Sequence, residues 1–370
     1  MLFSSFDSHG MRRALELARR GEGFVEPNPM VGAVVASPAD GGTIIAEAWH
    51  EEFGGPHAEA LALDRAGEAA RGSTLYLTLE PCCHRGKTPP CTEQIIKAGV
   101  ARVVVAAGDP YPEVDGGGIA ALRTAGITVE IGLLEAEAVR LTAPFRMLVT
   151  GGRPWVIAKW AMSLDGRLAA PPGGDRWISS EESLKIVHRL RGRIDAILVG
   201  IGTALSDDPL LTARPEGPRR ALRIVLDGTA RLPPDSRLAV TAREWPLLVA
   251  VGPGATAERI AALQEAGCEV WQGMEADPEE RVATLLSELG RRKYTNLLVE
   301  GGAAILGTFF AGGLVDEVYA FTAPKILGGA GDPLPVLPDT PPVDVEEVLH
   351  PDCDILVRGL VRRNDQISPR

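Results

Sequence analysis

One histidine, one glutamate and two cysteines in the first half of the chain have residue types and spacing that suit metal-assisted hydrolysis. A His-x-Glu triplet contains His57 and Glu59, a Pro-Cys pair ends at Cys82, and eight residues separate Cys82 from Cys91. An imidazole and two thiolates supply three ligands to a tetrahedral zinc ion, whose fourth position stays open for water. A carboxylate beside that position can carry protons without binding the metal. We therefore predict zinc ligation by His57, Cys82 and Cys91, with Glu59 as the proton carrier.

The elements that carry these residues can be predicted from their neighbours. Pro56 and Pro90 each precede a stretch of helical composition, so His57 and Cys91 are expected near helix N-termini, where the dipole favours thiolate over thiol. The segment 83–90 is basic, turn-rich and bounded by prolines, which indicates a loop. It makes the cysteine spacing longer than the Pro-Cys-x-x-Cys signature of zinc nucleobase deaminases, which the pattern otherwise matches.

A structural zinc site is the alternative, with Cys83 or His84 as a fourth protein ligand. A closed site of that kind would leave Glu59 without a role. A catalytic site accounts for all residues of the pattern together, so we expect a catalytic site.

Composition and charge restrict the class of protein. The chain has 370 residues, enough for two domains, with 45% hydrophobic and 24% charged residues, as in soluble globular proteins. Its apolar runs are short and its N-terminus lacks a secretory pattern, so we expect a cytoplasmic protein with no membrane partner. Five cysteines, three of them clustered, suit metal binding in a reducing compartment. The net charge of −11 opposes attraction to a nucleic-acid backbone, so no nucleic-acid partner is expected.

The order of the predicted elements indicates two α/β domains, residues 1–149 and 150–370, joined by a Gly- and Pro-containing linker at 150–154. The first has a mixed sheet with helices on both faces. Its predicted helices are 11–20, 57–70, 119–125, 135–148 and one from residue 92, and its strands are 31–36, 43–48, 74–79, 102–106 and 128–131. In the second, the predicted helices are 182–191, 257–266, 278–290 and one from residue 303, and the strands are 155–160, 196–199, 222–227, 247–251, 269–271, 296–300, 317–321 and 354–360.

Three segments of the second half carry residues that could bind or react. Residues 296–306 read as a buried strand, a Gly-Gly turn and a helix start, whose free N–H groups could hold a phosphate. The full Gly-x-Gly-x-x-Gly spacing is missing, so a Rossmann dinucleotide site is not expected. The other two segments are 200–209 and Lys159 with 163–167. Taken singly, the aspartates of the first of these are typical turn or cap residues.

Taken together, these motifs resemble the bifunctional riboflavin-biosynthesis deaminase/reductase family over nearly the whole chain. The similarity lies in residues 27–32, 56–59, 78–91 and 108–110 of the first half, and in 163–167, 177–180, 203–209, 211, 212, 214 and 300–302 of the second. The long insert between the cysteines is specific to this family among related deaminases. Cys83 stands where a serine is usual, and Cys82 is kept as the ligand because it directly follows Pro81.

The resemblance implies two reactions and two cofactors. Zinc-dependent hydrolytic deamination of a diaminopyrimidinone ribosylamine 5′-phosphate would come first, and reduction of its ribosyl group to ribityl with NADPH would follow. The implied folds are cytidine-deaminase-like and then dihydrofolate-reductase-like. The expected partners are this small-molecule pyrimidine ribosyl phosphate and, in a homo-oligomer, further copies of the chain.

The resemblance also implies roles for single residues. Asn28 would hydrogen-bond the base or the ribose of the deaminase substrate, and the insert residues His84, Lys87 and Thr88 would hold its 5′-phosphate or its pyrimidine. NADPH would contact Met162, Trp177, Thr203, Asp207, Gly301 and Gly302. The reductase substrate would contact Asp175, Arg191, Leu211, Arg214 and Glu300. Lys159, Asp207 and Glu300 are alternative proton donors among which the sequence does not choose.

Three other functions stay open at this point. The chain could be a nucleic-acid or nucleoside editing deaminase with an unrelated appended domain. It could be a non-catalytic scaffold with a closed zinc site. It could also retain only one active half, because a domain can keep its fold after losing its chemistry.

Overall fold

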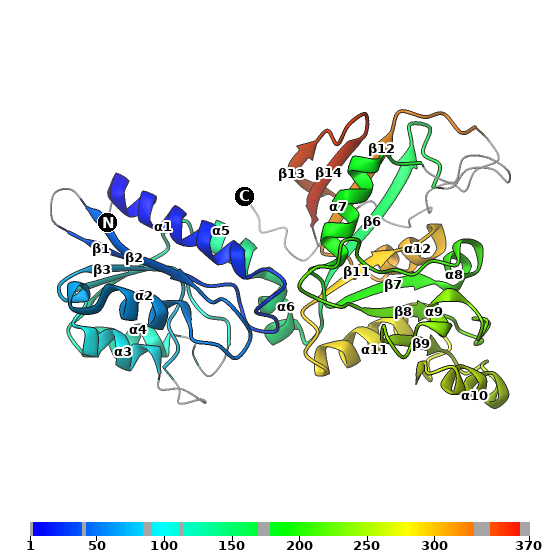
Figure 1. Ribbon diagram of the computed structural model, residues 1–370, viewed down its shortest axis with the longest axis horizontal. Coiled ribbons are helices and arrows are strands. Elements are labelled where there is room, and N and C mark those ends of the chain that lie inside the picture. Colours follow the sequence, from blue (N-terminus) through cyan, green and yellow to red (C-terminus); the bar gives the residue numbers. More distant parts are fainter. Residues whose placement is uncertain are drawn as a thin grey trace. The chain divides into compact units, whose positions relative to one another are not determined.

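The computed structural model describes residues 3–38, 42–83, 90–111, 114, 116–168, 178–328 and 341–362. The chain divides into two compact units, residues 1–152 and 153–370 (Figure 1). Among the described residues, the first unit has one sheet of five strands and the second has one sheet of nine.

The sheet of the first unit has the strand order β2-β1-β3-β4-β5. Its strands are β1 (Gly32–Ser37), β2 (Thr43–Trp49), β3 (Thr74–Leu79), β4 (Arg102–Ala107) and β5 (Thr128–Ile131). β1 runs antiparallel to β2 and to β3, whereas β3, β4 and β5 are parallel. The predicted mixed sheet is therefore confirmed, and the segments that follow β3 and β4 start from the same edge.

Side chains that alternate along the strands give this sheet two apolar faces. One face packs against α2 (Ala58–Ala66), α3 (Cys91–Ala98) and α4 (Gly117–Thr124). The opposite face packs against α1 (Ser5–Ala18) and α5 (Glu135–Leu141), as Figure 1 shows. The two helices whose N-termini carry His57 and Cys91 therefore cover the same face.

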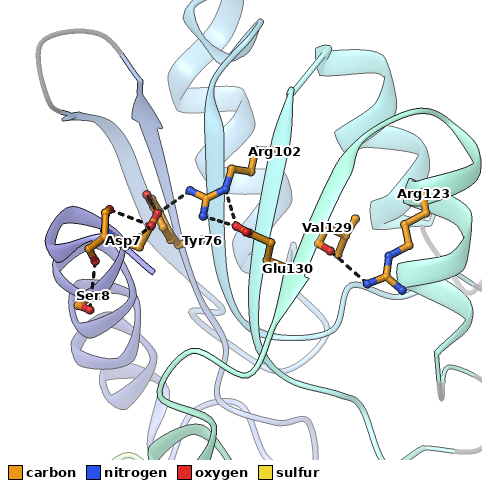
Figure 2. A network of polar contacts seen from close by, with 8 residues as sticks. Asp7, Ser8, Tyr76, Arg102, Arg123, Val129 and Glu130 are labelled. Carbon is orange, nitrogen blue, oxygen red and sulfur yellow. Dashed lines mark hydrogen bonds and ion pairs between the residues drawn. The ribbon is translucent and has the colours of Figure 1, made fainter. Parts of the chain in front are cut away.

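A polar network joins α1 to three strands (Figure 2). Ser4 and Asp7 form a capping box at the start of α1. The Asp7 carboxylate also accepts hydrogen bonds from the Tyr76 hydroxyl, at 2.9 Å, and from Arg102, which pairs in addition with Glu130. Burial alone would raise the pKa of Asp7, but Arg102 and the other donors lower it well below its ordinary value. Tyr76, Arg102 and Glu130 lie in β3, β4 and β5. The buried Asp7 carboxylate therefore connects α1 to the sheet through this network.

The sheet of the second unit has the order β10-β9-β8-β7-β11-β6-β12-β14-β13. Its strands are β6 (Trp155–Ser163), β7 (Ala196–Gly200), β8 (Leu222–Leu226), β9 (Leu247–Val251), β10 (Glu269–Gln272), β11 (Asn296–Glu300), β12 (Glu317–Ala323), β13 (Val343–Leu349) and β14 (Ile355–Val361). β14 is antiparallel to β12 and to β13, and the other described pairs are parallel. The carboxyl ends of β6, β7 and β11 consequently lie along one edge.

Helices cover both faces of this sheet as well. Apolar residues of α8 (Ile201–Asp207), α9 (Arg237–Val240) and α10 (Ala257–Glu265) pack on one face, and those of α11 (Pro278–Arg291) and α12 (Ala303–Ala311) pack on the other. α7 (Glu181–Arg191) packs through Val187 against β12 and β14. The α/β class predicted for this half is confirmed.

Some predicted elements are wrong in detail. The single helix expected at 135–148 is two helices, because α5 ends at Leu141 and α6 (Ala143–Gly151) begins with Pro144 in its first turn, where no N–H is available to continue α5. α6 therefore extends into the expected linker. The first helix starts at Ser5 and not at residue 11, since the capping box lies at its true start. Within the described ranges, no helix is both long and apolar enough to cross a membrane.

Candidate active sites

Three metal-ligand side chains converge in the first unit. His57 is the N-cap residue of α2, Cys91 is the first residue of α3, and Cys82 lies three residues after β3. The His57 Nδ1 atom is 3.2 Å from Cys91 Sγ and 3.7 Å from Cys82 Sγ, and the three ligand atoms all lie within 4.8 Å of one another. Tetrahedral zinc with Zn–N and Zn–S bonds of about 2.0 and 2.3 Å separates such N and S atoms by about 3.6 Å. The donor set and its spacing therefore fit zinc, which these residues could hold.

The cluster contains three ligands, not four, within the part of the chain that the structure describes. Cys83 is not one of them. Its Sγ atom lies beside α4, 2.8 Å from the position that a Cβ on Gly117 would take. The closed-site alternative thus loses Cys83 as its fourth ligand, and His84, the other one considered, lies outside the described residues.

Glu59 stands in the first turn of α2, two residues after His57. Its side chain is buried, and its Oε2 atom has no hydrogen-bond partner among the described residues. Burial raises the pKa of Glu59, although the adjacent His57 opposes the change. A buried carboxyl oxygen without a hydrogen-bond partner can exchange a proton with a molecule bound beside it.

The pKa values of Cys82 and Cys91 are shifted in opposite directions. A hydrogen bond from Cys91 lowers the pKa of Cys82 against the effect of burial, with a further contribution from His57. The same hydrogen bond raises the pKa of Cys91. The Cys91 main-chain N–H donates to Cys82 Sγ at 3.4 Å, so the N-terminus of α3 stabilises a thiolate at Cys82. These contacts favour a thiolate at Cys82, the form of cysteine that binds a metal ion.

His50 also belongs to this site, although no motif in the sequence selects it. Its Nδ1 atom donates to the Pro56 carbonyl at 3.0 Å, which leaves Nε2 to accept from the Asn28 side-chain amide at 3.1 Å. Burial lowers the pKa of His50 and so keeps it in this neutral form. Its ring centroid lies 5.5 Å from that of His57. His50 therefore fixes the Asn28 amide next to the metal cluster. The only sequence signal is its place directly after β2.

Glu80 fixes the segment that leads to Cys82. Its buried carboxylate accepts main-chain hydrogen bonds from Gly116 and Ile119, each at 3.1 Å, and from Asp109 at 3.4 Å. The carbonyl of Pro81 packs so closely on Gly118 that a Cβ there would lie 2.1 Å from it. The turn after β3 is consequently held against the start of α4, which sets the position of the Cys82 thiolate.

A second charged cluster joins β6, β11 and α7 in the second unit. Lys159 and Glu300 are register partners, with Lys159 Nζ 3.8 Å from Glu300 Oε2. Arg191 donates from Nε and Nη2 to the two Glu300 oxygens at 2.6 and 2.8 Å. Burial would raise the pKa of Glu300, but Arg191 and Lys159 lower it to about 2, while burial lowers the pKa of Lys159. Arg191 is therefore a partly buried ion-pair partner, not an exposed helix residue.

The loop after α8 is attached to this cluster. Arg191 Nη1 donates to the Thr212 carbonyl at 3.5 Å. The preceding residue, Leu211, is 4% exposed and has a φ of +55°, a conformation that leucine rarely adopts. Burial lowers the pKa of His188, which lies one turn before Arg191, and the charges of Arg191 and Arg214 lower it further. Arg191, Leu211 and Arg214 therefore lie close together, next to His188 and the charged cluster.

The expected cofactor residues lie along the same edge of the sheet. α8, which contains Thr203 and ends at Asp207, begins directly after β7. Gly301 and Gly302 lie between the adjacent strand β11 and α12. Met162 is near the carboxyl end of β6, the strand on the other side of β11.

The turn from β11 to α12 requires a glycine. A Cβ on Gly301 would lie 2.8 Å from the Cβ of Ile305, whereas no atom of the described residues lies within 4 Å of a Cβ position on Gly302, the N-cap of α12. The N-terminus of α12 is therefore open to a ligand. The remaining expected site residues lie outside the described residues: His84, Lys87, Thr88, Asp175 and Trp177.

The chain is similar to known proteins in both halves. Residues 4–107 match the family described as the cytidine and deoxycytidylate deaminase zinc-binding region, and residues 154–355 match the RibD C-terminal domain. Riboflavin biosynthesis protein RibD of Aquifex aeolicus is 40% identical over 330 residues, which cover 88% of this chain and 89% of that protein. The Escherichia coli K12 protein of the same name is 37% identical over 94% of this chain and 98% of its own length.

Solved structures give the same result. Acinetobacter baumannii RibD, form 1, superposes with a TM-score of 0.84 at 33% identity and covers 96% of this chain and 99% of that one. A diaminohydroxyphosphoribosylaminopyrimidine deaminase/5-amino-6-(5-phosphoribosylamino)uracil reductase of Thermotoga maritima superposes with a TM-score of 0.82 at 36% identity, again over 96% and 99% of the two chains.

Proposed function

The chain belongs to the RibD family of riboflavin biosynthesis proteins, and from this membership we propose which residues carry its two activities. It is a bifunctional enzyme, a zinc-dependent deaminase in its first half and a reductase in its second. Its substrate is 2,5-diamino-6-ribosylamino-4(3H)-pyrimidinone 5′-phosphate, whose deaminated product it reduces with NADPH. The name of the Thermotoga maritima relative, which specifies this deaminase and this reductase, supports the assignment.

In the deamination, His57, Cys82 and Cys91 hold the zinc ion. When bound, zinc supplies Lewis-acid activation of the attacking water. Glu59 takes a proton at its unpartnered Oε2 atom as water attacks the amine-bearing ring carbon. It passes this proton to the ring nitrogen, then takes the proton of the newly added hydroxyl group and passes it to the amine, which leaves as ammonia. Asn28, fixed by its hydrogen bond with His50, orients the base.

In the reduction, NADPH supplies a hydride to the open-chain ribose carbon when it is bound. Thr203, Asp207 and the N-terminus of α12 are the residues that would hold it. Arg191 and Arg214 bind the substrate phosphate, for which paired guanidinium donors are suited. Glu300 holds Arg191 in position through two hydrogen bonds.

Among the three proton donors considered, we favour Lys159. Glu300, with a pKa of about 2, carries no proton to give at neutral pH. Asp207 is an exposed carboxylate at the end of α8. Lys159 is partly buried beside Glu300, and burial lowers its pKa, which makes its proton easier to release.

The observation that carries the deaminase assignment is the buried, unpartnered Glu59 oxygen beside a cluster of three ligands. The test supplies the diaminopyrimidinone ribosylamine phosphate to zinc-loaded protein and follows two signals. Ammonia should be released without NADPH, and NADPH should be consumed only once the deaminated product has formed. Zinc-loaded protein that releases no ammonia from this substrate would contradict the assignment.

We also propose that the protein is a cytoplasmic homo-oligomer without a nucleic-acid partner. Support for oligomerisation comes from the outermost strand β13, where Val343, Val345 and Val348 are 37%, 57% and 52% exposed. Their register partners in β14 are Val361, Gly359 and Val357, which are spaced two residues apart. The three valines therefore lie on the same face of the sheet and form an exposed apolar face. A two-fold dimer would cover such a face with its own copy. Sedimentation equilibrium of wild type and of Val345→Glu tests this: the variant should be monomeric if the face is the interface.

The alternative of an editing deaminase with an unrelated appended domain finds no support, because residues 154–355 match the RibD C-terminal domain. The net charge of −11 also disfavours a polynucleotide substrate.

A further inference from the structure

Arg223, in the interior strand β8, is fully buried with its guanidinium among neutral acceptors. Nη1 donates to the Leu210 carbonyl at 3.2 Å and to the Thr241 hydroxyl at 2.8 Å. Nη2 donates to the Leu238 carbonyl at 3.2 Å and to the Trp245 carbonyl. Among the described residues, no carboxylate forms an ion pair with Arg223, and its Nε atom has no hydrogen-bond partner.

A buried charge without a counter-charge is costly, so its retention needs a reason. Burial lowers the pKa of Arg223 to about 10, which still leaves it protonated at neutral pH. An apolar side chain would fill the same volume in a strand at lower cost. What an apolar side chain cannot do is supply a rigid fork of donors to carbonyl groups from separate segments.

Arg223 connects two kinds of segment, one packed in the core and one an irregular loop. Leu238, Thr241 and Trp245 belong to α9 and the turns that follow it, which pack into the core. Leu210 belongs to the loop between α8 and β8. At the start of the same loop, Asp208 has a φ of +39° and accepts from the Arg237 main-chain N–H at 2.8 Å. Arg223 therefore links the irregular loop that contains Leu210 to the packed segment formed by α9 and the turns after it.

The Leu210 carbonyl lies next to a residue of that loop with a left-handed backbone conformation. Leu211, with its φ of +55°, directly follows the Leu210 carbonyl that Arg223 holds. The carbonyl of Thr212, the residue that follows Leu211, accepts from Arg191 at 3.5 Å. The carbonyls on either side of Leu211 are thus each held by a guanidinium group. The first guanidinium group is that of Arg223 in β8. The second is that of Arg191, which pairs with Glu300.

We propose that Arg223 is a positioning residue for the reductase substrate: by holding the Leu210 carbonyl, it fixes Leu211 and the segment to Arg214 in the conformation that receives the substrate. This inference rests on the proposed reductase function and on the substrate contacts proposed for Leu211 and Arg214. Arg223 itself touches neither substrate nor cofactor. Its loss should therefore weaken substrate binding while it leaves the NADPH site and the chemical step in place.

The test uses the full-length, zinc-loaded protein and two substitutions. Arg223→Met keeps the aliphatic stem and removes all donors, and Arg223→Lys keeps the charge but loses the fork. Arg243→Met is the matched control, because exposed Arg243 makes the same kind of bond, from its guanidinium group to the Glu265 carbonyl at 3.2 Å, outside the loop of Leu210 and Leu211. Ammonia release by the first half serves as an internal activity reference for every preparation.

For Arg223→Met, the KM for the reductase substrate should rise about tenfold or more, which corresponds to about 1.4 kcal/mol of binding. The KM for NADPH and the kcat should stay within about threefold, the signature of lost uniform binding. Arg223→Lys should fall between this variant and wild type. Arg243→Met should match wild type in all three constants. An unchanged substrate KM, or equal losses in the constants for NADPH and substrate, would overturn the proposal and leave Arg223 a purely structural residue.

If Arg223→Met does not fold, hydrogen exchange on Arg223→Lys decides. Faster exchange of the amides in 208–214, with no change in α10, supports the positioning role, and uniform exchange across the unit overturns it. A failure of the proposed function is distinguishable from both results, because wild-type protein would then consume no NADPH with the deaminated product.

Discussion

Replacement of Glu300 by glutamine should move the pH dependence of the reductase to lower pH. The proposed donor Lys159 works only when protonated, so kcat should be present below its pKa in the complex and fall as the pH rises through that value. Burial already lowers this pKa, and the Glu300 charge opposes the shift. Glu300→Gln removes that opposition and leaves the repulsion from Arg191 unshielded. Both changes act in the same direction, so the fall in kcat should begin at lower pH.

The size of the shift follows from the structure. Lys159 Nζ and Glu300 Oε2 are 3.8 Å apart. At an effective dielectric constant of about 20, unit charges at that distance interact by about 4 kcal/mol, which corresponds to about three pKa units. Water that enters the altered cluster will screen part of this, so we expect a shift of at least about one unit.

The assay is NADPH oxidation at saturating product of the deaminase step, measured across the pH range for wild type and Glu300→Gln. Saturation matters because Glu300 also holds Arg191, so the variant should bind its substrate more weakly. Glu288→Gln, which removes a surface carboxylate paired with Arg291, is the control and should leave the profile unchanged. A basic limb that stays in place, or moves to higher pH, would refute Lys159 as the proton donor.

Three further predictions concern the rest of the molecule. Tyr76→Phe removes a buried hydrogen bond to the ionised Asp7 carboxylate and should destabilise the first unit by about 2 kcal/mol in denaturant unfolding; an unchanged midpoint would contradict the role given to that network. Chelation of the metal should abolish ammonia release while reduction of the deaminated product by NADPH continues, and loss of both activities together would show that the sites are not independent. Gly301→Ala places a methyl group 2.8 Å from the Ile305 Cβ and should raise the KM for NADPH several-fold with ammonia release unchanged; a normal KM would remove the β11–α12 turn from the cofactor site.

The metal cluster could be predicted from sequence because its chemistry is local. His57 and Glu59 share one helix start, and Cys82 and Cys91 are marked by the prolines before them. The buried parallel strands could be predicted too, since segments such as β7 and β9 are continuous apolar runs. These features depend on neighbours in the chain.

What escaped prediction depends on contacts between distant segments. His50 acquires its role from a hydrogen bond to Asn28, 22 residues away, and Arg223 from the Leu210 loop and the turns after α9. β13 was missed because its Val-Asp-Val-Glu-Glu-Val pattern contains a bulge, which breaks the strict alternation that marks a strand. No rule about spacing alone could have selected these residues.

The central claim is that Glu59 transfers protons beside a metal that it does not bind. Glu59→Gln removes the titrating oxygen and retains the shape of the side chain. The decisive measurement combines zinc content and ammonia release on the same preparation of this variant. We predict one zinc ion per chain, as in wild type, and ammonia release reduced at least about a hundredfold. A variant that keeps both its zinc and its full deaminase rate would contradict the account.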